Sequence, residues 1–118
     1  MSGAAQLIEA AQAVSRDAAA LEKLLLQMVV RQAAERFGCD RSEVLETSRG
    51  DNFDKPAVRA RFVTLYLLAT IIPDWTHGRV AALTGVSRGA VSRAVRRIAD
   101  ARDEDPALDR WLDDVEAL

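Results

Sequence analysis

Four arginines fall within ten residues in the second half of this chain: Arg88, Arg93, Arg96 and Arg97. They follow a glycine in the segment 80–98, which reads VAALTGVSRGAVSRAVRRI. A guanidinium group presents a planar fork of donors that can bind a phosphate or the edge of a guanine base. The first question is therefore whether this segment is an ordinary pair of packed helices or a surface that binds nucleic acid.

Charge is strongly separated along the sequence. The whole chain of 118 residues carries a net charge of −2. Residues 55–99, however, contain eight basic residues and a single acid, Asp74, so this segment carries +7 and the remainder −9. A basic segment of this kind attracts a polyanion. The alternative is a solvated basic face that is balanced by acidic flanks.

The residues around Gly85 predict a helix–turn–helix. Glycine permits the sharp turn, and Ala81 is small enough for two helices to approach each other closely. Ser87 is a good cap for the second helix. On a helical wheel, the apolar and polar residues of this second helix separate into two opposite arcs. The apolar arc contains Val91, Ala94, Val95 and Ile98, and the polar arc contains Arg88, Gly89, Ser92, Arg93 and Arg96.

The polar arc predicts how this helix would bind duplex DNA. Recognition helices read bases mainly from their first turns, which favours Arg88, Ser92 and Arg93 as base-contacting residues. Gly89 allows close approach. The remaining members of the predicted DNA-binding set on this segment are Ser87, Arg96 and Arg97, and the last two are expected to hold phosphate.

The alternative interpretation of these arginines is structural. Arginines late in a helix favour its C-terminal dipole and pair with nearby acids such as Asp100 or Asp103. This fits Arg97 and Arg102. It does not explain Arg88, because a cation in the first turn of a helix is disfavoured by the dipole.

The other segments also have helical patterns, so the expected fold class is all-α. Residues 15–118 are expected to form a single compact domain of several helices, and residues 1–14 either extend the first helix or remain loose. The central core helix begins at Pro56 and is stopped by Pro73. Helices are expected at about 15–37, 41–45, 56–72, 76–84, 87–102 and 106–118.

No catalytic or metal-binding constellation is present, so we expect neither an enzyme nor a cofactor or metal site. His77 has no second histidine or nearby cysteine, which is typical of a surface or capping role. The single cysteine, Cys39, cannot form a disulfide framework. No apolar run is long enough to cross a membrane, and no signal-peptide core follows the N-terminus. A cytoplasmic protein is expected.

Three segments resemble the C-terminal DNA-binding domain of the bacterial chromosomal replication initiator DnaA, whose fold is related to the Trp repressor. They are VVRQAAERFGCDRSEVLETSR, VRARFVTLYLLATI and the helix–turn–helix that ends in Arg96-Arg97-Ile98, and together the resemblance covers about four-fifths of the chain. It implies that Arg61 enters the minor groove and that Arg59 lies beside it. A surface ion pair with Asp51 or Asp54 is the alternative for both.

Two departures from that family limit what can be carried over. The family has a Gly-Gly-Arg-Asp-His-Ser/Thr signature at the turn, whereas this chain has TGVSRGAV, so those base contacts do not transfer. The chain also lacks the G-x-x-x-x-G-K-[ST] loop of an ATP-binding module. The resemblance therefore implies a DNA-binding domain that is used as a regulator of transcription or replication.

The predicted function is sequence-specific binding of duplex DNA. The rival function is that of a protein-interaction module that keeps a degenerate helix–turn–helix fold. The arc of residues 88–96 discriminates between the two functions, because a domain that no longer binds DNA need not retain its arginines. The sequence leaves open whether the chain is a monomer or a homodimer, and also the DNA target and any effector.

Overall fold

The computed structural model describes residues 3–46, 50, 52–72 and 74–117, and over these residues the chain is all-helical. This confirms the expected fold class. The six helices are α1 (Gly3–Phe37), α2 (Arg41–Val44), α3 (Pro56–Ile71), α4 (His77–Thr84), α5 (Arg88–Glu104) and α6 (Pro106–Glu116). The expected bounds of α3 and α5 differ from these by one and two residues. Pro73, which was expected to stop α3, lies outside the described residues.

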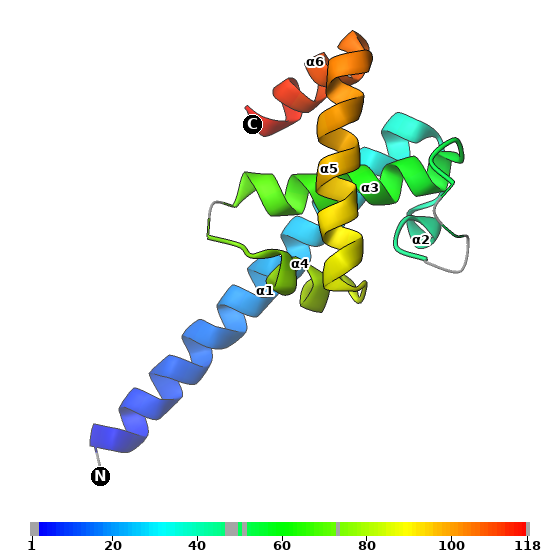
Figure 1. Cartoon of the computed structure of the whole chain (residues 1–118). Coiled ribbons are helices and arrows are strands. Elements are labelled where there is room, and N and C mark those ends of the chain that lie inside the picture. The colour runs from blue at the N-terminus through cyan, green and yellow to red at the C-terminus, as the bar shows by residue number, and fades with distance from the viewer. Residues whose placement is uncertain (1–2, 47–49, 51, 73, 118) are drawn as a thin grey trace.

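Helix α3 is the centre of the domain, as its apolar pattern predicted. Pro56 occupies its first turn, where the missing backbone N–H costs nothing. The end of α1 packs against α3, and α5 crosses it (Figure 1). Because α3 is covered on several sides, it is buried around most of its circumference. Its fully buried residues include Val58, Val63, Leu65, Leu67 and Leu68.

Helix α1 is longer than expected and leaves the domain. It runs without a break from Gly3 to Phe37, so Ser15 lies inside the helix and does not cap it. Residues 3–14 therefore extend the helix. Its buried residues all lie near its C-terminal end, namely Val29, Val30, Ala33 and Ala34. The N-terminal part projects away from the other helices (Figure 1), and Gly38, at φ 71°, ends the helix as predicted.

The connection between α4 and α5 has the predicted local chemistry. Thr76 caps α4 by accepting a hydrogen bond from the backbone N–H of Arg79, at 3.1 Å. Gly85 follows α4 in the left-handed conformation with φ 79°, which is costly for any residue with a Cβ. Ser87 then caps α5 by accepting a hydrogen bond from the N–H of Ala90, at 3.0 Å.

Arg102 of α5 forms ion pairs that hold α6 against α5. Arg102 pairs with three carboxylates of α6, those of Asp109, Asp113 and Glu116, and not with Asp100 or Asp103 as the sequence suggested. Its Nη1 also donates to the hydroxyl of Tyr66 at 2.9 Å. Burial opposes the charge of Arg102, but the hydrogen bonds that it donates to Asp109 and Tyr66 raise the pKa of its guanidinium above the ordinary value.

Candidate nucleic-acid interface

The outward face of α5 contains the arginines that the helical wheel placed there. Val91, Ala94 and Ile98 have no exposed surface, and Val95 is half-buried against the core. The opposite face is open to solvent. Its exposed residues are Arg88, Gly89, Arg93, Arg96, Arg97 and Asp100. The predicted division of α5 into an apolar arc and a basic arc is therefore confirmed.

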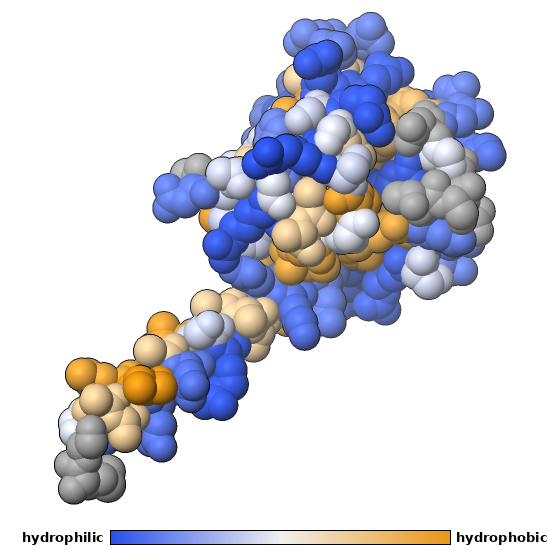
Figure 2. Space-filling view, turned by 60° about the horizontal axis from the view of Figure 1, so that its bottom comes forward, coloured by the Kyte–Doolittle hydropathy of each residue, from blue (hydrophilic) through white to orange (hydrophobic). Residues whose placement is uncertain are grey.

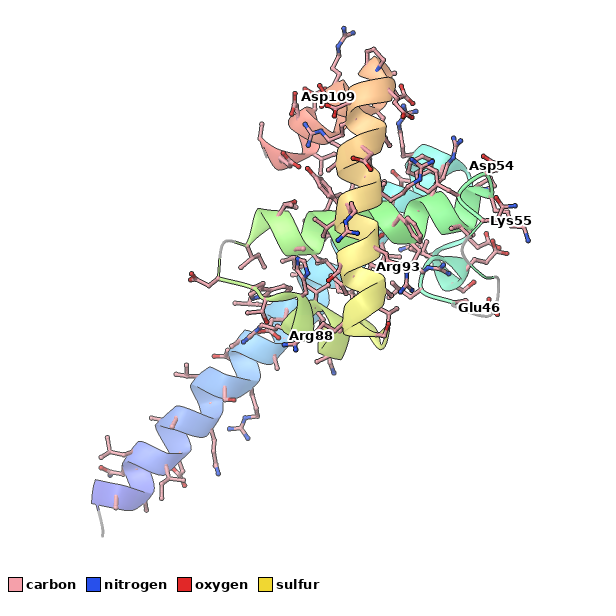
Figure 3. All side chains as sticks on the ribbon, in the orientation of Figure 1. Glu46, Asp54, Lys55, Arg88, Arg93 and Asp109 are labelled. Carbon is pink, nitrogen blue, oxygen red and sulfur yellow. The ribbon has the colours of Figure 1, made fainter. Side chains whose placement is uncertain are left out.

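The arginines do not all point the same way. Arg88 lies beside α4, and Arg93 lies on the side toward the loop that follows α2 (Figure 3). A Cβ added at Gly78 would lie 2.8 Å from Nη2 of Arg88, so the guanidinium of Arg88 covers this glycine in the first turn of α4. Arg88 therefore lies at the contact between α4 and α5. Because its side chain is long and exposed, rotation about its bonds can carry it outward.

Ser92 is held by a residue that the sequence did not assign to the site. Its Oγ lies 2.9 Å from Nδ1 of His77, at the start of α4, and both side chains are half-buried. His77 therefore fixes the position of Ser92 on the face of α5. The sequence predicted a surface or capping role for His77, whereas in the structure its ring joins α4 to α5. No pattern in the sequence links these two positions, which are fifteen residues apart.

The middle of α5 lies next to the aromatic ring of Phe53. The guanidinium carbon of Arg97 lies 4.3 Å from the ring centroid of Phe53, which is within the range of a cation–π interaction. Arg59 shares the same ring at 5.4 Å, and its Nε donates to the carbonyl of Phe53 at 2.8 Å. Phe53 thus orders two basic side chains on one surface. A shallow groove here is lined by Phe53, Phe62, Arg93, Arg96, Arg97 and Asp100.

Three of these guanidinium groups have no acidic partner among the described residues. Within the part of the chain that the structure describes, no carboxylate lies within ion-pair distance of Arg88, Arg96 or Arg97. Arg102, five residues after Arg97 on the same helix, pairs with three carboxylates. The same helix therefore carries one arginine that is used inside the fold and several that leave their charge available to an anion outside it.

Arg61 does not lie where the family resemblance would put it. Its residue surface is 3% exposed, and its guanidinium donates to two backbone carbonyls, that of Glu46 at 3.0 Å and that of Gly50 at 2.6 Å. This arrangement ties α3 to the chain that follows α2. We therefore correct the expectation that Arg61 enters a minor groove, because the side chain is enclosed by its own protein. Arg59 remains exposed, and it lies over the ring of Phe53.

The other candidate sites gave no competing chemistry. Over the described residues, no group of three or more His, Cys, Asp or Glu side chains could hold a metal ion. None of the helices there combines the length and apolar character needed to cross a bilayer. Comparisons of the chain with protein-family models, with curated proteins and with solved structures found no significant match.

Proposed function

We propose that this protein binds duplex DNA in a sequence-dependent manner, with α4 and α5 acting as a helix–turn–helix and α5 lying in the major groove. The observation that carries the proposal is the row of exposed arginines on the outer face of α5, directly after a sharp turn at Gly85. Three of them, Arg88, Arg96 and Arg97, have no carboxylate partner among the described residues. An α-helix fits the width of the major groove, where arginine is the commonest reader of guanine. The resemblance to the DnaA domain points the same way.

The proposal gives separate tasks to the two halves of α5. Arg88, Ser92 and Arg93 lie in its first turns and contact bases, while Gly89 lets the helix backbone approach the groove. Arg96 and Arg97 hold phosphate, and Arg59 extends the phosphate contacts onto α3. Ser87 is committed to capping α5, and its exposed hydroxyl retains one donor for a phosphate oxygen.

The biological action that follows is occupancy of a DNA site. A small DNA-binding domain changes transcription or replication by blocking or recruiting other machinery at the site where it binds. The acidic remainder of the chain keeps nonspecific attraction to DNA modest, because its charge opposes that of the basic segment. Specificity then depends on the base contacts of α5.

Selection of bound duplexes from a random library, at moderate salt, tests this function. The wild type should yield a defined motif. Arg88→Ala should lose discrimination between bases at one or two positions of that motif, at about 1–3 kcal/mol per lost contact. Arg97→Ala should weaken binding to all duplexes by a similar factor and leave the motif unchanged, because a phosphate contact carries no sequence information.

Circular dichroism of both variants provides the control for folding, and both should match the wild type because the two side chains are exposed. If no motif emerges from the wild-type selection, sequence-specific binding is excluded. If both variants change the motif equally, the proposed division of α5 between bases and phosphates is wrong.

A further inference from the structure

The large apolar side chains that the described chain exposes all lie on α1. Their exposed fractions run from 52% to 73%. They are Leu7, Ile8, Val14, Leu21, Leu24 and Met28. Apolar and polar atoms separate onto different sides of the projecting helix (Figure 2). Before Glu22, which is paired with Arg79 of α4, no contact with the other helices is recorded among the described residues. A helix that carries an unburied apolar side with so little tertiary support is marginally stable in water.

The apolar residues follow a seven-residue repeat. Leu7, Val14, Leu21 and Met28 are each separated by seven positions, and small or apolar residues fill the intervening positions at Ala4, Ala11, Ala18 and Leu25. The resulting alternation of three and four residues is the pattern of a coiled-coil seam. A second stripe with the same repeat consists of Glu9, Arg16 and Lys23, and it lies on the opposite side of the helix.

The repeat stops where the domain begins. Val29 is the first residue of α1 with a fully buried side chain, and from there the helix turns its apolar residues toward α3. Leu25 and Leu26 are half-buried at the edge of the domain. The free seam therefore runs from Ala4 to Met28, a length of about 36 Å at the rise of an α-helix. The domain covers part of Leu25, near the C-terminal end of the seam, whereas Leu7, Val14, Leu21 and Met28 stay exposed.

We propose that this seam pairs with the same seam of a second copy of the chain in an antiparallel two-helix coiled coil. Ile8 and Leu24 flank the seam, each next to one of its residues, so all six exposed large side chains border the contact. If each of the six buries roughly 100 Å², as its transfer energy implies, two copies remove about 1,200 Å² from water. That is the lower bound for a stable protein–protein interface. A two-fold arrangement uses the same face on both copies, so one stripe serves both partners.

The sizes of the residues select the antiparallel direction. In that direction, Ala4 faces Met28 of the second copy, Ala11 faces Leu21, and Ala18 faces Val14, so three of the four kinds of layer join a small residue to a large one. A parallel pair would stack alanine on alanine and leucine on leucine in alternate layers. Close packing favours layers of equal volume.

Charge favours the same direction. In a parallel pair, Asp17 of each copy would lie beside Glu22 of the other, which creates two repulsive contacts at the flanks of the seam. Arg79, which pairs with Glu22 in the same chain, reduces this repulsion without removing it. The antiparallel pair brings the two Asp17 carboxylates near each other once, at the two-fold axis. The two domains then lie at opposite ends of the helical pair, so they do not obstruct each other.

The first test is the mass of the full-length chain in solution, measured by sedimentation equilibrium in the micromolar range and without DNA. The wild type should have about twice the 12.9 kDa of one chain. The double variant Val14→Glu/Leu21→Glu should have the mass of one chain, because it places four carboxylates in the seam of a dimer. Its domain should stay folded, since these positions are 68% and 66% exposed.

The matched control is Ala13→Glu/Ala20→Glu, which adds the same charge one residue earlier, away from the seam, and should remain a dimer. A wild type that stays monomeric throughout the concentration range overturns the proposal, as does a dimer that both double variants leave intact. The test involves no nucleic acid, so its outcome is independent of the proposed function.

Crosslinking determines the direction of the helices. In a Cys39→Ser background, chains carrying Ala11→Cys are mixed with chains carrying Leu21→Cys under oxidising conditions. An antiparallel pair places these positions within disulfide distance only between unlike chains, so the mixture should form crosslinked dimers and Ala11→Cys by itself should not. Crosslinking of Ala11→Cys by itself would establish a parallel pair and overturn the antiparallel arrangement.

Discussion

The arginines of this small domain occupy three different environments, which differ in the burial of the side chain and in the groups that accept its hydrogen bonds. Arg102 holds α6 through three carboxylates, and Arg61 holds the chain after α2 through two backbone carbonyls. Arg88 and Arg96 are exposed and have no carboxylate partner among the described residues. A sequence shows that an arginine is present, but it does not show whether the surrounding chain has used its hydrogen-bond donors.

Arg61→Ala should destabilise the fold. The guanidinium donates to the carbonyls of Glu46 and Gly50 while its residue is 3% exposed, so its removal loses two charge-assisted hydrogen bonds and the packing of the side chain. We expect the free energy of unfolding to fall by about 2–3 kcal/mol. Urea denaturation followed by circular dichroism measures this change.

Arg59→Ala is the matched control for that experiment, because Arg59 is two residues earlier on the same helix and exposed. Its loss should cost less than about 1 kcal/mol, the value of an exposed cation–π contact. If Arg61→Ala leaves stability unchanged but weakens DNA binding selectively, the assignment inferred from the DnaA resemblance is correct and the structural role argued here is not.

At the scale of helices, the sequence predicted the parts whose signals are local. Gly85 and Ser87 marked the turn and the cap before α5, and the apolar spacing of α5 identified its buried face because periodicity depends only on the helix itself. The position of Arg61 was not predictable in this way. Its hydrogen-bond partners lie 11 and 15 residues away, on a stretch of chain with no regular pattern.

The course of α1 was equally hard to predict. Its leucines and valines appear together as one apolar helix in the sequence, but the structure divides them between the core at Val29 and Val30 and the exposed seam at Leu7, Val14 and Leu21. A hydrophobic repeat shows that a face must be buried. It does not show whether the covering surface belongs to the same chain, because that depends on how far the neighbouring helices extend.

Gly89→Ala should separate the stability of α5 from its function. Gly89 is helical, and an added Cβ would lie 3.5 Å from Nη1 of Arg93, an ordinary contact. The free energy of unfolding should therefore rise by about 0.5–1 kcal/mol, because alanine favours the helix over glycine. If α5 lies in the major groove, the methyl group obstructs close approach, and affinity for the selected motif should fall.

Thermal denaturation and fluorescence anisotropy with the selected duplex measure these two effects on the same sample. Gly78→Ala serves as a comparison, because its Cβ is added on α4. There it would displace the flexible guanidinium of Arg88, and it would add no bulk to the face of α5. Equal or tighter DNA binding by Gly89→Ala would show that the first turn of α5 does not approach the DNA closely.

At the scale of the whole molecule, the two proposed surfaces lie on different parts of the chain. The basic face belongs to the domain built around α3, whereas the apolar seam belongs to the part of α1 that projects from it (Figures 1 and 2). The longest dimension of the chain, 62 Å, reflects this projection. If both proposals hold, substitutions on different helices should remove DNA binding and dimer formation separately.

An antiparallel dimer with a DNA-binding domain at each end should join two separate duplexes. The seam of about 36 Å holds the two domains apart, so each α5 can occupy its own DNA molecule. The measurement is retention of a fluorescent duplex on beads that carry a second, unlabelled duplex, with the selected motif on both. The wild type and Ala13→Glu/Ala20→Glu should retain the label. Val14→Glu/Leu21→Glu should lose it and yet bind a single duplex with unchanged intrinsic affinity, because its α5 is untouched. If the wild type forms a dimer and binds DNA but retains no label, both α5 helices engage one duplex, and the two domains lie on the same side of the seam.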